Sequence, residues 1–394
     1  SIGGFTFVVF KTYKMNDMKG KQGLVCMGLL LVLSSCHTGK QITASGLQRK
    51  DFQTEVNGQH ADLFTLSNKQ GMEVCITNYG ARVVSILVPD RNGKREDVVC
   101  GFSTITEYME QRQNFGSTVG RYIGRILNAR FTLDGVEYKL VPNNGKSGHI
   151  SHGGNPGFAD RIWKVEQADT HRVRLSYLSP DGENGFPGNL KVTLVYSLGE
   201  DDNALDLTYE ATTDAPTVLN LSHHSFFNIS GNFTKSVEDQ QLWVDADRFT
   251  PYDDKKCVTG EYLQVAGTPL DFRMPHAIGE CIDADHPQLK VVNGYDHTWE
   301  LNTKGDDTRP AAWVYDPASG RKMEIFTTEP GMQIYTGNGL KGKMTGKGGI
   351  AYPFRSAVCF ETMHFQDSPN QPGFPSTVLR PGEVFRSHTV YKFE

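Results

Sequence analysis

The sequence of 394 residues has little that would place it among nucleic-acid-binding, zinc-binding or nucleotide-binding proteins. Its formal net charge is −5, so it has no basic excess to attract a nucleic acid, and we expect no nucleic-acid partner. Its seven cysteines form no CxxC pair, which argues against a structural zinc site. Residues 337–343 have P-loop spacing, but Met344 replaces the Ser or Thr that would hold Mg²⁺. Helical periodicity is also scarce, which leaves β-structure as the main expectation.

The first 35 residues have the pattern of an export signal. Four lysines between positions 11 and 21 precede an apolar run over 23–33, which is too short to remain across a bilayer. The run ends in Leu-Ser-Ser-Cys36 and resembles a bacterial lipoprotein signal, in which the cysteine is lipidated and becomes the first residue. A plainly cleaved signal peptide and a buried core strand are the alternatives. We interpret residues 1–14, which precede Met15 and Met18, as a misassigned start or a cloning remnant.

The lipoprotein interpretation gives a location and a division of the chain. It predicts a bacterial cell-envelope protein on the periplasmic or outer-membrane side, held to the membrane only by a lipid on Cys36. Residues 1–35 would be the start region and signal peptide, 36–50 a polar tether, and 51–394 one folded domain. No internal repeat or long linker divides that domain. The five cysteines within it are scattered and odd in number, which argues against a disulfide framework.

Alternation of apolar and polar residues dominates the domain. Apolar residues occupy every second position over 192–198 and again over 205–211, and the turn residues 199–203 join the two stretches. One short helix is predicted over 104–111, capped by Ser103. Many strands at short spacing, separated by turn clusters, predict an all-β fold: a large antiparallel sandwich with few short helices.

Two adjacent histidines, His223 and His224, lie in the stretch Asn220–Ser230, which has the pattern of a strand end followed by a loop. Successive strand side chains point to opposite faces, so one ring can face the core while the other faces a cleft. A histidine is a good proton donor near neutral pH because its ordinary pKa is about 6.5. The plainer explanation is a hydrogen-bonded core histidine. The catalytic explanation requires a carboxylate partner, for which Glu361 is the candidate.

Other stretches place charged or amide side chains where a binding site would need them. Two arginines stand four apart, a histidine precedes two glycines, an aspartate lies in a tight turn, a glutamine lies among aromatic residues, and a glutamate lies inside an apolar run. These residues are Arg121 and Arg125, His152, Asp296, Gln333 and Glu361. Each alone has an ordinary structural explanation. Together, and without a metal motif, they suit a pocket for a neutral polyhydroxylated ligand.

A histidine metal site is conceivable from four residues, His152, His224, His297 and His364. They lack the close paired spacing, or the i, i+4 spacing on a helix, that common histidine sites show. We therefore expect no metal. No cofactor motif is apparent in the sequence either, so we expect a reaction that needs no cofactor.

Six of these motifs, in this order, resemble those of the aldose 1-epimerases, or galactose mutarotases. The resemblance covers about residues 62–393 and implies a β-supersandwich of the galactose mutarotase type. In the first half of the motif set, Gly120–Ile126 resembles G-R-x-x-N-R-I, His152–Gly154 resembles H-G-G, and Asn220–Ile229 resembles N-L-T-N-H-S-Y-F-N-L. In the second half, Tyr295–His297 resembles Y-D-H, Glu329–Asn338 resembles E-P-G-x-Q-x-Y-T-G-N, and Phe360–Asn370 resembles L-E-T-Q-x-F-P-D-S-P-N.

Carried over position by position, the resemblance implies an active site. His224 would be the proton donor and Glu361 the base. The ligands would be small aldose sugars such as glucose or galactose, and we expect a monomer. The sugar-binding groups would be Arg125, His152, Asp296 and Gln333.

Three departures from the family motifs concern the preferred sugar. Gly124 stands where the family usually has Asn, which removes one amide contact to the sugar. Ser151 replaces the usual Leu before His-Gly-Gly, and Phe226 replaces the usual Tyr and so removes a hydroxyl. None of the three changes the acid or the base.

Mutarotation needs an acid and a base, and the two candidate residues can supply them. A base takes the proton of the anomeric hydroxyl while an acid protonates the ring oxygen, and the opened aldehyde recloses on its other face. A carboxylate is ionised at pH 7, which suits Glu361 as the base, and His224 suits the acid. Two other functions stay open: a glycoside hydrolase or lyase that would use Glu361 with Asp296, and a non-catalytic sugar-binding lipoprotein.

Overall fold

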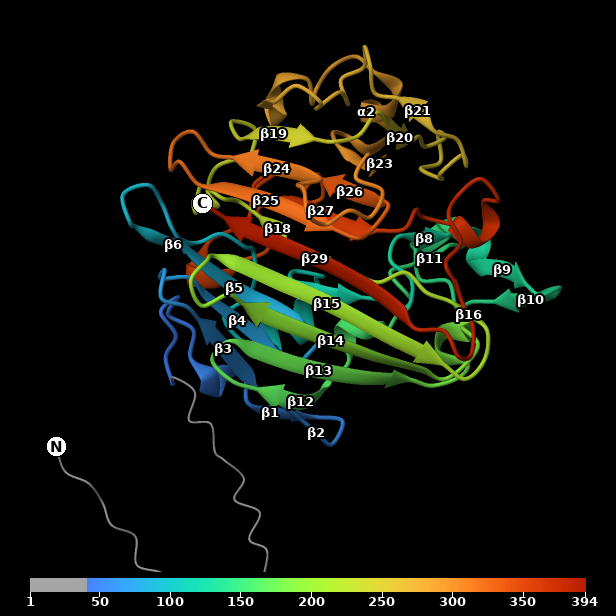
Figure 1. The fold of residues 1–394 in the computed structure, drawn as a ribbon, viewed down its shortest axis with the longest axis horizontal. Helices are drawn as coiled ribbons and strands as arrows, with labels where there is room; N and C mark the ends of the chain where they lie inside the picture. The colour runs from blue at the N-terminus through green and yellow to red at the C-terminus, as the bar shows by residue number, and fades with distance from the viewer. Residues whose placement is uncertain (1–40) are drawn as a thin grey trace, which may run out of the picture. The chain divides into compact units, whose positions relative to one another are not determined.

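The computed structural model of the protein describes residues 41–394, and its largest element is a nine-stranded antiparallel sheet that crosses the domain (Figure 1). The strands of this sheet lie in the order β12 (Lys164–Ala168), β13 (Arg172–Ser179), β14 (Leu190–Leu198), β15 (Ala204–Thr213), β29 (Phe385–Phe393), β25 (Lys322–Thr327), β24 (Ala312–Tyr315), β19 (Gln241–Val244) and β22 (His276–Ala277).

The alternating pattern in the sequence is visible in β14 and β15. Leu190, Val192 and Leu194 of β14 are fully buried, while the residues between them are half-buried or exposed. Leu198 pairs with Leu205 across the predicted turn, and the two strands stay in register along their length. A side chain of this size contributes about 1.5–3 kcal/mol when it is fully buried, which favours one face of the sheet. The predicted hairpin is confirmed.

Two smaller antiparallel sheets cover the inner face of the large one. Leu207 of β15, Ile86 of β5 and Ile334 of β26 belong to one cluster of buried side chains, so the three sheets share a core. This packing confirms the predicted sandwich. The six-stranded sheet has the order β18 (Phe226–Phe227), β27 (Val358–Met363), β26 (Gly331–Tyr335), β23 (Asp296–Glu300), β20 (Arg248–Thr250) and β21 (Leu263–Gln264); the four-stranded sheet consists of β3 (Leu63–Ser67), β4 (Glu73–Thr77), β5 (Arg82–Pro89) and β6 (Arg95–Asp97).

Short strand pairs connect these sheets and carry several of the predicted site residues. They are β1 (Thr54–Val56) with β2 (Gln59–Ala61), β9 (Arg130–Leu133) with β10 (Val136–Lys139), β8 (Arg125–Ile126) with β11 (Ile150–Ser151), β7 (Ser117–Val119) with β17 (Ser222–His224), and β16 (Thr217–Val218) with β28 (Val378–Leu379).

Helices are few in the described part of the chain, as predicted. They are α1 (Ile105–Gln111) and α2 (Pro287–Val292), with 3₁₀ turns such as η8 (Ser368–Asn370) between strands. The cap expected at Ser103 is wrong: the Thr104 side chain accepts from the backbone N–H of Glu107, and the Glu107 carboxylate accepts from the Thr104 amide. This reciprocal capping box satisfies two backbone donors at once. Among residues 41–394, neither helix is long and apolar enough to cross a membrane.

The predicted signal, the lipid site at Cys36 and the start of the tether lie outside the described residues. The rest of the expected tether, residues 41–50, contacts the domain. Leu47 is buried, and Glu73 accepts hydrogen bonds from the backbone amides of Ala44 and Ser45 at 2.7 and 3.2 Å.

Candidate active site

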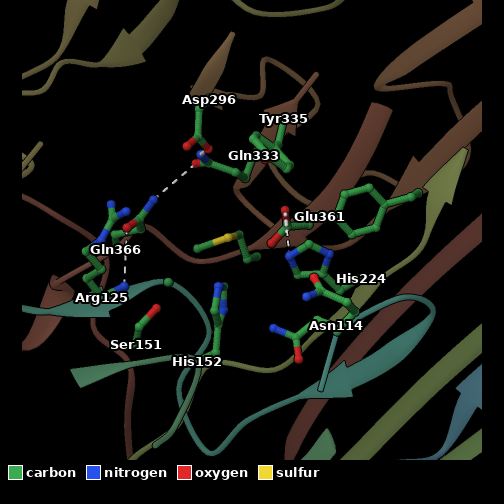
Figure 2. A pocket seen from close by; sticks show the side chains of 14 residues that line it. Asn114, Arg125, Ser151, His152, His224, Asp296, Gln333, Tyr335, Glu361 and Gln366 are labelled. Atoms are coloured by element: carbon green, nitrogen blue, oxygen red, sulfur yellow. Dashed lines mark hydrogen bonds and ion pairs between the residues drawn. The ribbon is translucent and has the colours of Figure 1, made fainter. Parts of the chain in front are cut away.

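The six side chains predicted to bind or react with a sugar all line one cavity of about 250 Å³ (Figure 2). They reach it from five different strands and one loop, so the sheets must assemble before the site exists. The full lining is Gln113, Asn114, Gly124, Arg125, Ser151, His152, His224, Phe226, Asp296, Gln333, Tyr335, Glu361, Met363 and Gln366.

The strand β17 separates the two adjacent histidines, as alternation predicts. His224 lines the cavity, whereas the His223 ring lies in the core, with Nε2 2.7 Å from the Ser225 hydroxyl and its ring packed near Tyr196 and Tyr391. Burial and the neighbouring His224 lower the pKa of His223 to about 3. The plainer explanation, a hydrogen-bonded core histidine, therefore holds for His223.

His224 reaches the cavity because the chain changes partners beside it. In β17 it pairs with Ser117 of β7, and two residues later Phe226 of β18 pairs with Cys359 of β27. The crossing places the imidazole over β27, where Glu361 lies two residues beyond Cys359 on the same face. The Phe226 ring stacks on the His224 ring at 5.1 Å between centroids and covers it with an apolar surface.

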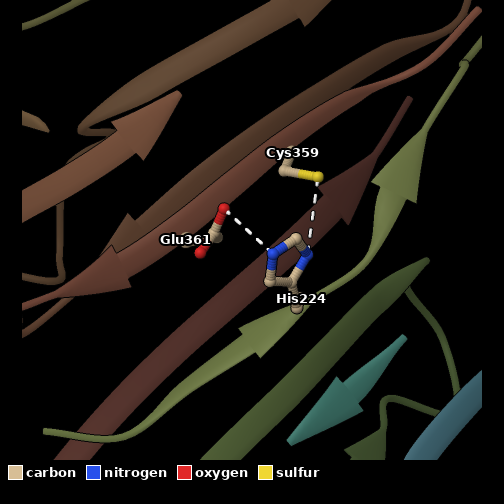
Figure 3. Close-up of side chains that lie close together, drawn as sticks. All are labelled: His224, Cys359 and Glu361. Carbon is tan, nitrogen blue, oxygen red and sulfur yellow. Dashed lines mark hydrogen bonds and ion pairs between the residues drawn. The ribbon is translucent and has the colours of Figure 1, made fainter. Parts of the chain in front are cut away.

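The His224 ring stands between a thiol and a carboxylate (Figure 3). Its Nε2 lies 3.5 Å from Oε1 of Glu361, and its Nδ1 lies 3.7 Å from Sγ of Cys359. The side chains of His224 and Glu361 are 8% and 4% exposed. The distance of 3.5 Å between Nε2 and Oε1 is long for a hydrogen bond, so neither group is fully engaged by the other. It is short enough for one bound sugar to contact both groups.

Burial shifts the pKa values of both His224 and Glu361. Burial lowers the pKa of His224 to about 4. Burial, followed by the charge of Asp296, raises the pKa of Glu361 well above its ordinary value. Desolvation disfavours both charged forms, so burial favours the neutral imidazole and the neutral carboxyl in the free pocket.

His152 and Arg125 form one side of the cavity. The His152 ring meets the His224 ring edge-on, with centroids 5.5 Å apart, and its Nδ1 is buried without a partner. Burial, then the charges of His224 and Arg125, lower the pKa of His152 to about 3. A neutral imidazole that lines a polar cavity suits a sugar hydroxyl as its hydrogen-bond partner.

Asp296 and Gln333 form another side, on the neighbouring strands β23 and β26. Nε2 of Gln333 donates to Oδ1 of Asp296 at 2.6 Å, and the Thr298 hydroxyl donates to Oε1 of Gln333 at 2.5 Å. Burial raises the pKa of Asp296, while the charge of Arg125 and the Gln333 amide act in the opposite direction. The amide thus holds the carboxylate in a fixed orientation.

Two residues of this wall were missed from the sequence. Gln366 lines the cavity, and Tyr252 lies behind it, with its hydroxyl 2.7 Å from Nε2 of Gln366. A signal for Gln366 was present, because the family motif has Pro at that position. Tyr252 comes from a loop after β20 and carried no signal.

Three residues singled out from the sequence lie away from the cavity. The buried Arg121 donates to the carbonyls of Pro187 and Gly188 and so fixes loops rather than a ligand. His297 is buried against Phe249 and Tyr252. His364 pairs with Glu329 at 2.7 Å. Of the four histidines considered for a metal, His152 and His224 lie together in the cavity, while His297 and His364 lie away from it.

A different set, His224, Cys359 and Glu361, places three potential ligand atoms within 4.8 Å of one another in the described chain. The imidazole uses opposite nitrogens toward its two neighbours, Nδ1 toward the thiol and Nε2 toward the carboxylate. That arrangement orients a ring for proton transfer better than it directs three ligands at one ion. The expectation of a reaction without a metal stays a prediction.

Comparison with known proteins gives the same answer as the site. Residues 62–392 match the family model described as aldose 1-epimerase. The chain is 40% identical to the bovine galactose mutarotase over 331 residues, which are 84% of this chain and 93% of that one. It is 36% identical to the aldose 1-epimerase of Escherichia coli over 339 residues, 86% and 96% of the two chains.

The fold agrees as well. An aldose epimerase homologue from C. elegans superimposes with a TM-score of 0.78 at 31% identity, covering 85% of this chain and 99% of that one. The family model matches most of the domain, the relatives are similar in sequence, and the fold is shared. These three findings support the same family assignment. The chain belongs to the aldose 1-epimerase family and is an enzyme, an isomerase of the mutarotase class.

Proposed function

We propose that the protein interconverts the α and β anomers of free aldoses, such as glucose or galactose, with Glu361 as the base and His224 as the acid. The observation that carries the proposal is the His224–Glu361 pair, 3.5 Å apart in a polar cavity whose other walls hold Arg125, His152 and Asp296. Amide, guanidinium and imidazole groups around a small cavity suit the hydroxyls of a monosaccharide.

In the forward direction, Glu361 takes the proton of the anomeric hydroxyl and the electron pair of that O–H bond forms the carbonyl at C1. The bond from C1 to the ring oxygen breaks, and the ring oxygen takes a proton from Nε2 of His224. The open aldehyde rotates about its bond to C2. Closure on the other face runs with the roles exchanged, and each group ends as it began.

The ring-opening step needs Glu361 as a carboxylate and His224 as an imidazolium, whereas burial favours the neutral form of each group. A sugar hydroxyl donating to the carboxylate and a ring oxygen accepting from the imidazolium stabilise those charged forms in place of water. Each positioned group typically contributes about 10²–10⁴-fold to the rate.

The remaining side chains bind and orient the sugar. Arg125 and His152 offer donors on one side, while Asp296 offers an acceptor whose orientation Gln333 fixes. The fixed orientation of Asp296 supports a role in sugar binding rather than in a pair of hydrolytic carboxylates with Glu361.

Polarimetry tests the proposal directly. Freshly dissolved α-glucose and α-galactose should reach their equilibrium rotation faster with the enzyme than without it, at a rate proportional to enzyme concentration. A glycoside hydrolase or lyase, or a binding protein without turnover, would leave the spontaneous rate unchanged. Such a result with folded protein would overturn the mutarotase mechanism.

We also propose that the protein is a lipoprotein of the bacterial cell envelope, anchored through Cys36. The sequence before Cys36 supports this location. The native protein should partition into detergent, and Cys36→Ser should release or mislocalise it. A native protein that is wholly soluble, with a mature end other than Cys36, would refute the proposal.

A further inference from the structure

Gln366 occupies the space that a side chain at position 124 would need. Gly124 has a left-handed backbone with φ of +72°, and a Cβ placed there would lie 2.5 Å from Cγ of Gln366. The Gln366 side chain therefore fits the pocket wall because residue 124 is a glycine. The family motifs have Asn at position 124 and Pro at position 366, so this chain differs from them at both residues of the contact.

The contacts of Gln366 fix which way its amide points. The backbone N–H of Arg125 can only donate, so the Gln366 oxygen faces it at 3.2 Å. The amide nitrogen then donates to the Tyr252 hydroxyl at 2.7 Å and to Oε1 of Gln333 at 3.3 Å. The same direction continues, since Gln333 donates to Asp296 at 2.6 Å. These bonds form a directed chain of amides that ends on the carboxylate.

Gln366, which begins this chain, lies across the cavity from Glu361 and His224 (Figure 2), whereas Gln333 pairs with Glu361 on the neighbouring strand. Gln366 is 5% exposed and lines the cavity, and its oxygen can accept a second hydrogen bond beside the one from Arg125. A sugar whose C1 lies at the acid–base pair directs the opposite side of its ring toward this wall. The hydroxyls at C3 and C4 are on that side.

We propose that Gln366 is a sugar-binding residue that determines specificity: its amide oxygen accepts a hydrogen bond from the hydroxyl at C3 or C4. It does so in place of the amide that Gly124 lacks. The inference rests on the proposed mutarotase function and adds to it the part of the sugar that this chain selects. Glucose and galactose differ at C4, so a contact with the C4 hydroxyl would discriminate between them, whereas a contact with the C3 hydroxyl would accept both.

The first experiment removes the amide while keeping the volume, with Gln366→Leu. On glucose and galactose, kcat/KM should fall about 10-fold, mostly through KM, as expected for one lost neutral hydrogen bond. The same substitution should change kcat/KM by less than about twofold on one of two deoxy sugars, the 3-deoxy or the 4-deoxy sugar. That sugar is the one that already lacks the hydroxyl contacted by Gln366. The matched control is Gln371→Leu, at a glutamine of the same segment whose amide donates to Asp367 and which does not line the cavity.

The second experiment moves the amide back, using Gly124→Asn and Gln366→Ala. Asn tolerates a left-handed backbone better than most residues. In the Gly124→Asn variant, kcat/KM should fall at least about 10-fold, because the new Cβ collides with Gln366. In the double variant, kcat/KM should return to within about threefold of the value of the unmodified enzyme. Recovery above the activity of Gln366→Ala alone would show that the amide introduced at position 124 replaces the lost contact, because relief of the collision by itself cannot exceed that activity.

The outcomes separate this inference from the function on which it rests. If the unmodified enzyme shows no mutarotation, the proposed function fails, and saturation-transfer NMR of sugar binding to the Gln366→Leu protein still tests the contact. If turnover is normal and Gln366→Leu costs the same on every deoxy sugar, or nothing on any, the inference is overturned. A fully active Gly124→Asn protein that keeps Gln366 would overturn it as well.

Discussion

Two histidine–glutamate pairs lie close together in sequence, one within β27 and one just after it, and they are built differently. Glu361 in the strand faces His224 at 3.5 Å across a cavity, while His364, one residue beyond the strand, bonds Glu329 at 2.7 Å. The first pair leaves space for a sugar oxygen at each group. The second is closed and leaves none, so it fixes the end of β27 to the loop before β26.

The two pairs also differ in the direction in which the pKa of the histidine is shifted. Burial lowers the pKa of His224 to about 4 and raises that of Glu361. Burial would lower the pKa of His364 too, but the hydrogen bond and charge of Glu329 outweigh it and raise the pKa above its ordinary value. The same two residue types thus favour their neutral forms when the contact is open, whereas the closed contact favours the charged form of the histidine.

The largest expected effect is loss of the acid. His224→Asn removes the proton donor but keeps a polar side chain, so turnover should fall by at least about 10³-fold while the melting temperature stays close to normal. The measurement is polarimetry with thermal unfolding of the same sample. A folded variant that keeps more than a tenth of the activity would remove His224 from the mechanism.

Loss of the base should be nearly as severe. Glu361→Gln keeps the shape of the side chain but cannot accept the proton, so mutarotation should drop at least about 10²-fold with folding intact. The matched control is Glu329→Gln in the closed pair, which should keep turnover within about threefold and lose stability instead. Equal losses of rate in the two variants would break the distinction between the pairs.

The sequence allowed the open pair to be located but not its protonation. Motif order identified His224 and Glu361, and strand alternation correctly separated His223 from His224, because a period of two is a local property of the chain. The pKa shifts depend on how completely the assembled sheets exclude water, which no local pattern records.

The same reason explains the parts that were missed. β14 and β15 could be predicted because one face of each strand is buried along its whole length. Tyr252 and Gln366 belong to irregular segments, and only the folded chain brings them together at 2.7 Å. The helix cap was wrong by one residue because Thr104 and Ser103 are both good caps, and the choice depends on which one pairs with Glu107.

The third prediction concerns stability in the closed pair. The pKa of His364 is raised in the folded state, so the ion pair stabilises the protein fully below the unfolded value of about 6.5 and loses that contribution as pH rises through the folded value. His364→Gln should therefore lower the free energy of unfolding by about 1–3 kcal/mol near pH 5.5. The gap between variant and unmodified protein should narrow at higher pH, as denaturant unfolding across the pH range would show.

For the His224–Glu361 pair, the free energy of unfolding should depend on pH in the opposite direction. The pKa of His224 is lowered on folding, so the unfolded chain binds the extra proton first and the unmodified protein loses stability as pH falls below about 6.5. His224→Asn removes that loss, and its stability relative to the unmodified protein should rise in acid. Slopes of the same sign for His224→Asn and His364→Gln would contradict the contrast between the two pairs.

The smallest expected effect belongs to the histidine that adjoins the acid in sequence but not in space. His223 is buried away from the cavity, with Nε2 at 2.7 Å from the Ser225 hydroxyl and Nδ1 at 3.5 Å from the Tyr196 hydroxyl. His223→Asn shortens the side chain and weakens these contacts, so it should cost about 1–3 kcal/mol of stability at most. The family motif has Asn at this position, which favours the low end of that range. Turnover should stay within severalfold of normal, because the ring does not touch the cavity. A loss of rate equal to that of His224→Asn, measured on folded protein by the same polarimetric assay, would show that both rings act in the site and would require the acid to be reassigned.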